Sequence, residues 1–438
     1  MPVNELDVRL EQAPVPIGLL QTDDDGSVSF RYREEYLAAP NCFPISLSLP
    51  LQEEPFGDVI AKAFFQNLLP ENDLLNEVME REGLAKSDVV GLLSHLGADL
   101  SGAISCLPEG APPVKAPGHL REDYIPLAQE QLEEIVTRLG KSQSLPNEVK
   151  DPSPVAGIQR KVALTEIDGA FAVPRPGSGA PTTHILKVPT TAIPREAYYE
   201  DRCARLIDGA GLDVAQSRSA WIAGYEVLIA TRFDRRTSGE HIYRLHQEDF
   251  AQALGLPPRL KYEREGRGTR IFNAEAVVSI LRSTAVPAEA FSAFLRATFA
   301  NLLIGNTDNH AKNHALLYDG SAAPRMAPLY DLTPIRINDE HTHQFAFKIG
   351  NAEFIEELTP DDVLAFLRSF GLEGPRASRF IRSDLLPIIQ PLATGPISDN
   401  EWIARLDRLV IETGALLLRV LEPIVAGTSS KPSEVHNA

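Results

Sequence analysis

The pattern of strands and helix between residues 161 and 235 constrains the fold most. It predicts three strands, a helix and a further strand, at residues 161–167, 170–174, 184–189, 195–212 and 226–235. Asp168-Gly169, between the first two strands, favours the tight turn of a β-hairpin. In the helix, Tyr199, Cys203 and Ile207 fall on one apolar face. This part of the chain therefore predicts a unit that mixes strands with one helix.

The flanking regions have different patterns. Residues 27–32 and 45–51 alternate like half-buried strands, and residues 58–69 have helical spacing that ends at Pro70. Residues 108–117 and 141–154 are rich in proline, glycine and polar residues, as linkers or long loops are. Beyond residue 235 the chain is mainly helical, with long apolar stripes around residues 290–303 and 402–425.

Composition excludes several classes of protein. The 438 residues exceed one ordinary domain and suit two or three packed units. The formal net charge of −18 opposes bulk binding to the phosphate backbone of nucleic acids. Residues 259–270, RLKYEREGRGTR, form a basic stretch that could still contact nucleic acid, but such blocks of charge are more typical of solvated loops.

The sequence also predicts the compartment. No apolar run reaches the roughly 18 to 20 residues that a membrane helix needs, and no leader pattern opens the chain. Cys42, Cys106 and Cys203 lie far apart without a CxxC pair, which argues against a disulfide framework or a zinc site. We therefore expect a cytoplasmic protein without membrane contact.

The most informative chemistry lies in residues 304–319, IGNTDNHAKNHALLYD, a polar loop between an apolar helix and an apolar strand. Polar groups in such a place are costly unless they are hydrogen-bonded or used. Asp308 and Asn313 have the D-x-x-x-x-N spacing of a protein-kinase catalytic loop, in which the aspartate accepts the substrate's proton and the asparagine holds magnesium. Asp331, farther on, suits a second ligand, since Mg²⁺ prefers hard oxygen atoms.

Two other interpretations of this loop stay open. Asn306, Asp308 and Asn309 can simply form Asx-turns, and the D-x-x-x-x-N spacing also arises by chance. His310 and His314 could bind a metal, although neither a predicted helix nor a third ligand supports this.

Upstream residues occur in the order of a kinase. Lys187 on the third strand can reach the α- and β-phosphates of ATP, and Glu200 on the following helix can pair with it. The strand end at Thr231, Arg232 and Phe233 occupies the place of the hinge that binds adenine through its backbone.

No G-x-G-x-x-G loop precedes this lysine. Residues 153–164, SPVAGIQRKVAL, stand in its place and offer Gly157 and Lys161. Backbone amides and a lysine can still cradle phosphates.

Several motifs, in this order, resemble the HipA family, the serine/threonine kinase toxins of type II toxin–antitoxin systems. The similarity covers nearly the whole chain and is most specific in residues 64–72, 97–110, 156–164, 183–189, 200–206, 232–235, 247–257 and 304–313. The resemblance implies an α+β, bilobal protein-kinase-like fold with an extra N-terminal β-rich subdomain and an all-helical C-lobe.

The resemblance also implies boundaries. We expect an N-terminal subdomain at 1–110, a connecting segment at 111–150, a kinase N-lobe at 151–235, a helical C-lobe at 236–428 and a disordered tail at 429–438.

Roles for individual residues follow from the same resemblance. The ATP site would consist of Lys187, Glu200, Lys161, Gly157, the hinge at Thr231 and Phe233, and His310 beside Lys312. Asp308 would be the catalytic base, with Asn313 and Asp331 as the magnesium ligands.

The family's known targets are aminoacyl-tRNA synthetases, notably the glutamyl enzyme, and its partner is a small helix-turn-helix antitoxin that represses the shared operon. The resemblance thus implies an ATP- and Mg²⁺-dependent protein kinase that acts as a growth-inhibiting toxin and meets DNA only through a HipB-like antitoxin. Two alternatives remain: a small-molecule phosphotransferase of the aminoglycoside type, and a catalytically silent partner in a DNA-bound repressor complex.

One position departs from the family pattern. Family members often have a serine three residues before the loop glycine, and its autophosphorylation silences the kinase. Here Pro154 holds that position and Ser153 precedes it. Either Ser153 is the autophosphorylated residue, or this control is absent.

Overall fold

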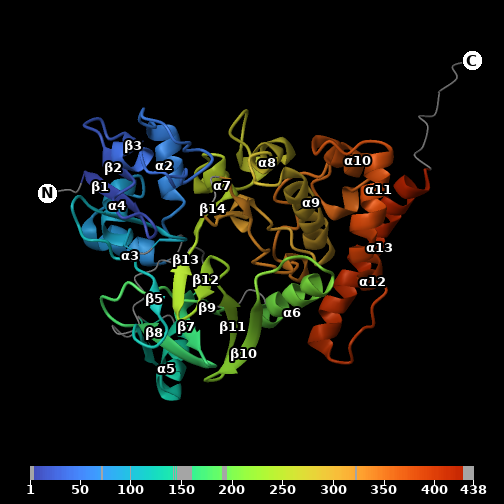
Figure 1. Ribbon diagram of the computed structural model, residues 1–438. Helices are drawn as coiled ribbons and strands as arrows, with labels where there is room; N and C mark the ends of the chain where they lie inside the picture. Colours follow the sequence, from blue (N-terminus) through green and yellow to red (C-terminus); the bar gives the residue numbers. More distant parts are fainter. Residues whose placement is uncertain are drawn as a thin grey trace, which may run out of the picture.

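The computed structural model describes residues 4–427 except 71–72, 99, 142, 144, 146–159, 190–194 and 321–322. It consists of a front unit, a middle sheet and a helical part (Figure 1). In the described part of the chain, no helix combines the length and the apolar composition that crossing a bilayer requires.

The front unit, residues 4–108, is an antiparallel sheet covered by helices. The strand order is β3-β2-β1-β4, with β1 at Glu5–Leu10, β2 at Gly18–Thr22, β3 at Val28–Tyr32 and β4 at Ile104–Pro108. The helices are α1 (Glu34–Leu37), α2 (Asp58–Gln66), α3 (Asp73–Glu82) and α4 (Val89–Leu96). Phe30, Phe64 and Phe65 are fully buried between sheet and helices, in an apolar core that continues into the helical part.

The strand that alternation predicted at residues 45–51 is wrong. That segment is a turn with a single bridge between Ser46 and Leu49. Its polar groups form hydrogen bonds to a distant part of the chain and not to a neighbouring strand. The Ser46 hydroxyl donates to the buried Glu248 carboxylate at 2.5 Å. Leu47 donates its backbone N–H to the same carboxylate at 3.0 Å.

The middle sheet has the strand order β10-β11-β9-β7-β8-β6. Its strands are β6 (Tyr124–Pro126), β7 (Arg160–Ile167), β8 (Ala170–Pro174), β9 (His184–Val188), β10 (Ser217–Ile222) and β11 (Tyr225–Thr231). The predicted hairpin is confirmed: Asp168 and Gly169 have φ of 51° and 81°, as a two-residue turn of this kind requires. Helix α5 (Gln129–Gly140) and helix α6 (Glu196–Gly209) contact this sheet.

The segment 111–150, predicted as a connecting segment, contributes to these sheets. It supplies β6 and α5, and also β5 (Gly118–His119), which pairs with β13 (His241–Arg244) beside β12 (Arg235–Ser238).

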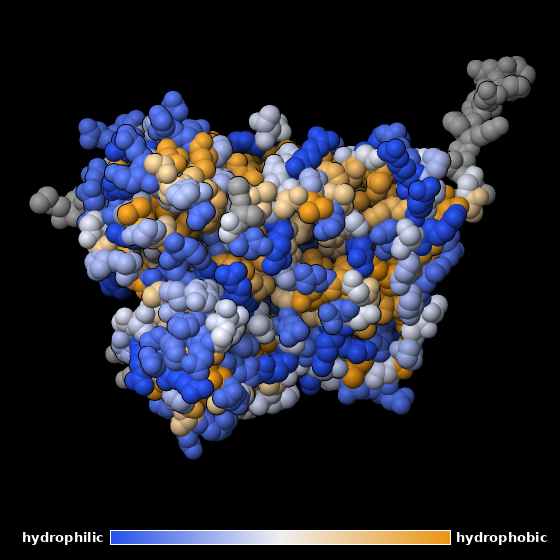
Figure 2. Space-filling model, viewed as in Figure 1, coloured by the Kyte–Doolittle hydropathy of each residue, from blue (hydrophilic) through white to orange (hydrophobic). Residues whose placement is uncertain are grey.

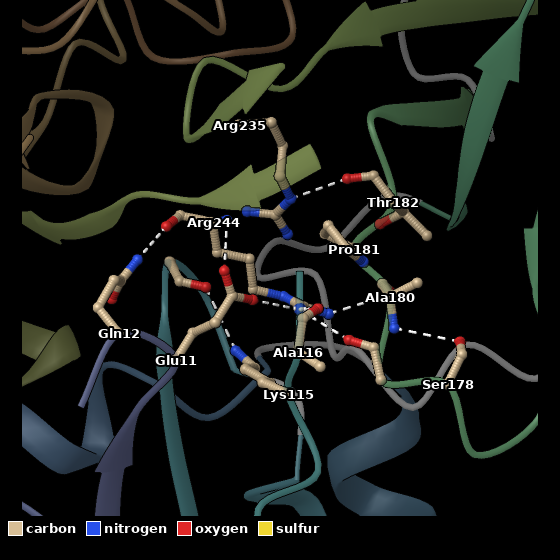
Figure 3. Close-up of polar contacts among 12 residues, drawn as sticks. Glu11, Gln12, Lys115, Ala116, Ser178, Ala180, Pro181, Thr182, Arg235 and Arg244 are labelled. Atoms are coloured by element: carbon tan, nitrogen blue, oxygen red, sulfur yellow. Dashed lines mark hydrogen bonds and ion pairs between the residues drawn. The ribbon is translucent and has the colours of Figure 1, made fainter. Parts of the chain in front are cut away.

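A buried arginine joins the front unit to this region (Figure 3). Arg244 on β13 places Nη1 2.7 Å from Glu11 Oε2. Only 2% of the Arg244 side chain and 1% of the Glu11 side chain is exposed. Its guanidinium also donates to the carbonyls of Gly179 at 2.9 Å and Ala180 at 3.3 Å. The Gln12 side chain donates to the backbone carbonyl of Arg244. Every charge in this contact is compensated, so it can fix the front unit against the loop between β8 and β9.

The helical part, residues 246–427, packs long apolar helices around a small sheet. Its helices are α7 (Phe250–Ala253), α8 (Ala274–Leu281), α9 (Pro287–Leu303), α10 (Pro360–Ser369), α11 (Pro375–Phe380), α12 (Leu386–Ala393) and α13 (Glu401–Ala426). The predicted stripes are confirmed, since Phe294, Leu406 and Leu417 are fully buried. Figure 2 shows one face of the molecule, on which hydrophilic residues dominate the periphery and apolar residues gather nearer the centre.

The expectation that this part is all-helical is wrong. Strands β14 (His246–Asp249), β15 (Ala315–Tyr318) and β16 (Arg325–Met326) form a three-stranded antiparallel sheet. The β15 residues are all buried, so their backbone groups need partners that water cannot provide. The two neighbouring strands, β14 and β16, supply these partners. The predicted disordered tail lies outside the described residues.

Candidate active site

A cavity of about 400 Å³ lies where the three parts meet. The front unit lines it with Asn67 and Leu68, the middle sheet with Lys161 and Lys187, and the helical part with Asp308. Residues that are far apart in sequence thus share one partly open cavity, lined by both polar and apolar groups, as ligand sites often are.

Two lysines meet on adjacent strands of the middle sheet. Lys161 on β7 stands directly opposite Lys187 on β9, so both side chains leave the same face of the sheet. Like charges in such a pair repel unless anions compensate them. Lys187 Nζ lies 2.9 Å from Glu200 Oε1 on α6 and 3.1 Å from Asp331 Oδ1. The predicted Lys187–Glu200 pair is therefore formed, beside a second cation.

The cluster sets the charge of its members. Burial alone would lower the pKa of Lys187, but the carboxylates of Glu200 and Asp331 outweigh burial and raise that pKa above its usual range. The Lys187 ammonium in turn holds the pKa of Asp331 below its usual value. Lys187 is therefore a cation and Asp331 an anion at neutral pH, the charge states that phosphate and magnesium binding need.

Asp308 lies in the loop between α9 and the short helix η4 (Ala311–Asn313). Its Oδ1 accepts a hydrogen bond of 2.7 Å from the Tyr262 hydroxyl, and its backbone N–H donates to Asn306 Oδ1 at 3.2 Å. Burial raises the pKa of Asp308, while the Tyr262 hydrogen bond opposes that rise. A fixed carboxylate with an increased affinity for a proton suits a general base.

A glycine lets the chain leave α9 sharply enough to form this loop. Gly305 has φ of +74°, a conformation that side chains rarely adopt. A Cβ atom there would lie 2.9 Å from Leu409 Cδ2 and 3.1 Å from Arg336 Cβ. Both the lack of space and the backbone conformation therefore favour glycine at position 305.

Asn313 and Asp331 fit a magnesium ion by the chemistry of their donors. Asn313 Nδ2 donates to the Asp308 carbonyl at 2.8 Å, which directs the side-chain oxygen away from that carbonyl. Asp331 has φ of 59°, and Asn306 Nδ2 donates to its carbonyl at 3.2 Å. Two hard oxygen ligands are enough when substrate phosphates and water complete the shell, as is usual for Mg²⁺.

A histidine-based metal site does not form in the described residues, where no group of three or more histidine, cysteine or acidic side chains can hold an ion. His314 lies among rings of the core, 5.0 Å from Phe294 and 5.2 Å from Phe250, and burial lowers its pKa to about 3. His310 lines the cavity, as expected, and its ring meets that of Tyr262 at 5.2 Å.

The predicted hinge lies at the edge of the cavity. Thr231 ends β11, Arg232 donates its backbone N–H to the Thr183 carbonyl at 2.9 Å, and the Phe233 ring lies 5.2 Å from that of Tyr330. Apolar side chains of Ile185, Ala230 and Leu329 also line the cavity and could cover a flat ring such as adenine.

Sequence reasoning missed Tyr262. Residues 259–270 were predicted to be a solvated loop, and that prediction is wrong for part of the segment. Leu260 is buried, and Tyr262 reaches the carboxylate of Asp308. A single aromatic residue within a run of charges was the only available signal.

The contribution of the front unit was also missed. Lys312 Nζ, in the loop after Asp308, lies 3.0 Å from Asn67 Oδ1 and 3.5 Å from Asp249 Oδ2. Asn67 follows α2, about 240 residues earlier in the chain, so no local pattern could predict this contact. Gly157 and Ser153, in contrast, lie outside the described residues.

Comparisons with known proteins match the chain over most of its length. The family model for the HipA-like C-terminal domain matches residues 153–383, and that for the HipA N-terminal domain matches residues 6–107. A candidate kinase of Sinorhizobium fredii, Y4mE, is 35% identical over 366 residues, which cover 83% of this chain and 86% of that protein.

Two further similarities involve Shewanella oneidensis. Its serine/threonine-protein kinase toxin HipA is 29% identical over 356 residues, which are 76% of this chain and 75% of that protein. A solved structure of a HipA, HipB and operator DNA complex from that organism contains a chain that superposes with a TM-score of 0.78 at 25% identity, over 96% of this chain and 99% of that one. The likeness thus extends to all three parts of the fold.

Proposed function

Because the chain belongs to the HipA family of serine/threonine kinases, we propose that it transfers the γ-phosphate of ATP in a Mg²⁺-dependent reaction and acts as the growth-inhibiting toxin of a toxin–antitoxin pair. One observation carries the proposal: Lys187 bridges Glu200 and Asp331 in the cavity that Asp308 and Asn313 also line.

Each of these residues has a task in phosphoryl transfer. Lys187 binds the α- and β-phosphates and is held in place by Glu200, while Lys161 adds a second positive charge beside it. Asp308 orients the acceptor hydroxyl and takes its proton as the bond to phosphorus forms. Catalysis of this kind depends on positioning and charge more than on covalent chemistry, so a few fixed polar groups are sufficient.

Asn313 and Asp331 would hold magnesium, which when bound neutralises charge on the phosphates. In the present arrangement Asp331 contacts the Lys187 ammonium at 3.1 Å. A bound ion would therefore compete with the Lys187 ammonium for this carboxylate. The adenine would lie against Phe233 and the backbone from Thr231 onwards.

The protein substrate and the protein partner are proposed separately from the reaction. By resemblance we propose an aminoacyl-tRNA synthetase as the substrate and a HipB-like helix-turn-helix antitoxin as the partner, in the cytoplasm. The related Shewanella complex contains HipB and operator DNA, which supports an indirect contact with DNA. A net charge of −18 argues against direct binding by this chain.

A small-molecule phosphotransferase is the weaker alternative, since it would not need the front unit. A catalytically silent repressor partner would not need Lys187, Asp308, Asn313 and Asp331 together.

The test is incubation of the purified chain with γ-labelled ATP, Mg²⁺ and a bacterial lysate, followed by identification of the labelled protein. Asp308→Asn is the matched control, because it keeps the size of the side chain and removes the base. We expect labelling only with the native chain. Equal labelling by both proteins would refute Asp308 as the base.

Autoregulation is a separate proposal. Proline cannot accept phosphate, so Ser153 would take the role of the family's autophosphorylated serine. Mass spectrometry of the active chain after incubation with ATP tests this, and an unmodified Ser153 peptide would reject it.

A further inference from the structure

The basic segment at residues 259–270 lies directly beside the proposed catalytic base. The Tyr262 hydroxyl contacts Asp308 at 2.7 Å, and the Lys261 carbonyl accepts a hydrogen bond of 3.1 Å from the backbone N–H of Ala311 in the catalytic loop. Lys261 also lines the cavity. The segment is therefore tied to the place where an acceptor hydroxyl must bind.

The same segment is held in one conformation by a glutamate. Glu263 donates its backbone N–H to the Ala346 carbonyl at 2.9 Å, and its Oε2 accepts the backbone N–H of Lys348 at 2.6 Å. The carboxylate of Glu263 is thus used inside the protein. Of the two acidic residues in the segment, only Glu265 is exposed.

Most of the exposed charged side chains of the segment are basic. The segment has five basic and two acidic residues, a net charge of +3 in a chain of net charge −18. Arg259, Arg264 and Arg267 are exposed, and the Arg264 guanidinium lies 4.1 Å from the centre of the Tyr262 ring. A local positive surface therefore begins next to the catalytic base and extends outwards from it.

From this geometry we infer that residues 259–270 dock acidic residues that flank the phosphorylated serine or threonine of the protein substrate. The inference rests on the proposed kinase function and adds the class of substrate. Because Tyr262 contacts Asp308, a peptide whose hydroxyl reaches that carboxylate lies beside this segment, and its Asp or Glu side chains can pair with the exposed arginines. Opposite charges at such a surface mainly confer specificity and speed of association.

A short acidic peptide fits this surface better than RNA does. A nucleic acid carries many regularly spaced charges, and the rest of this chain would repel it at long range. A few carboxylates beside one serine meet the local charge of +3 without bringing a long polyanion against the acidic surface.

The experiment uses the full chain with Mg-ATP and a dephosphorylated peptide library from a digested bacterial lysate. Phosphorylated peptides are identified by mass spectrometry, and the residues around each site are compared with the library. We expect Asp and Glu to be enriched near the phosphorylated residues. Because an exposed ion pair changes a binding constant by up to roughly fivefold, an enrichment of this order is expected at low salt and should shrink at high salt.

The matched variants reverse charge at exposed positions. Arg259→Glu combined with Arg267→Glu changes the docking surface, and neither residue is part of the catalytic group described above. Arg419→Glu, an exposed arginine on α13, is the control. The double variant should lose this roughly fivefold acidic preference while it phosphorylates neutral peptides at the native rate. The control should keep the native preference.

The outcomes separate this inference from the proposed function. Phosphorylation without acidic enrichment, or with enrichment that the double variant retains, would overturn the docking surface and leave the kinase intact. If the chain binds ATP but phosphorylates no peptide, the proposed function is overturned and the inference with it. Tight, salt-sensitive binding of a short single-stranded RNA that the double variant abolishes, with unchanged peptide preference, would assign the surface to nucleic acid instead.

Discussion

Replacing Tyr262 by phenylalanine isolates one hydrogen bond at the proposed base. The substitution removes the hydroxyl that donates to Asp308 at 2.7 Å. It keeps the ring that meets His310 at 5.2 Å and supports the Arg264 guanidinium at 4.1 Å. Any change in activity can therefore be assigned to the electrostatics of the Asp308 carboxylate.

The expected size follows from the energy of such a bond. A hydrogen bond to a charged group contributes about 1.5–3 kcal/mol, and Tyr262 is partly exposed, so we take about 1.5 kcal/mol. One pKa unit corresponds to about 1.4 kcal/mol. The hydroxyl lowers the pKa of Asp308, so its loss should raise that pKa.

A base must be deprotonated to act, so the acid limb of the pH profile should move to higher pH. The assay is kcat/KM for a peptide substrate at saturating Mg-ATP, measured against pH for both proteins. Below the limb the variant should be up to about tenfold slower, and well above it the rates should converge. An acid limb at the native position would refute the assignment of Asp308 as a base tuned by Tyr262.

Three further predictions test the charges of the fold. Lys187→Met leaves the buried Glu200 carboxylate without its cation, so urea denaturation should give a loss of about 3 kcal/mol, and ATP should no longer raise the Tm. Burial raises the pKa of Glu248 to about 7, so its contribution to stability is complete below the unfolded pKa of about 4.3 and is lost as pH rises through about 7. The unfolding free energy of the native chain should therefore fall by about 3 kcal/mol over that range, and much less for Glu248→Gln, as urea titrations at several pH values will test. Arg244→Met should cost about 3–5 kcal/mol because Glu11 stays buried and charged, and adding Glu11→Gln should recover part of this in the same assay; a double variant no more stable than the single one would contradict the ion pair.

Local patterns determined much of the fold. The Asp168-Gly169 turn follows from φ values that these residues tolerate, so the hairpin was predictable from two positions. The order of Lys187, Glu200, Asp308 and Asn313 predicted a kinase site, and the structure brings all four residues to one cavity. Helical spacing likewise predicted the buried stripes of α9 and α13.

Tertiary structure decided what no local pattern contains. Residues 45–51 alternate like a strand but bond to Glu248, because a partner some 200 residues away satisfies their polar groups. The β14–β16 sheet forms for a similar reason around the buried β15. Tyr262 reaches Asp308, and Asn67 reaches Lys312, only once the three parts have packed together. The sequence by itself therefore identified the polar residues that line the cavity. The packing of distant segments decided which neighbours contact them, since such contacts depend on long-range geometry rather than on spacing along the chain.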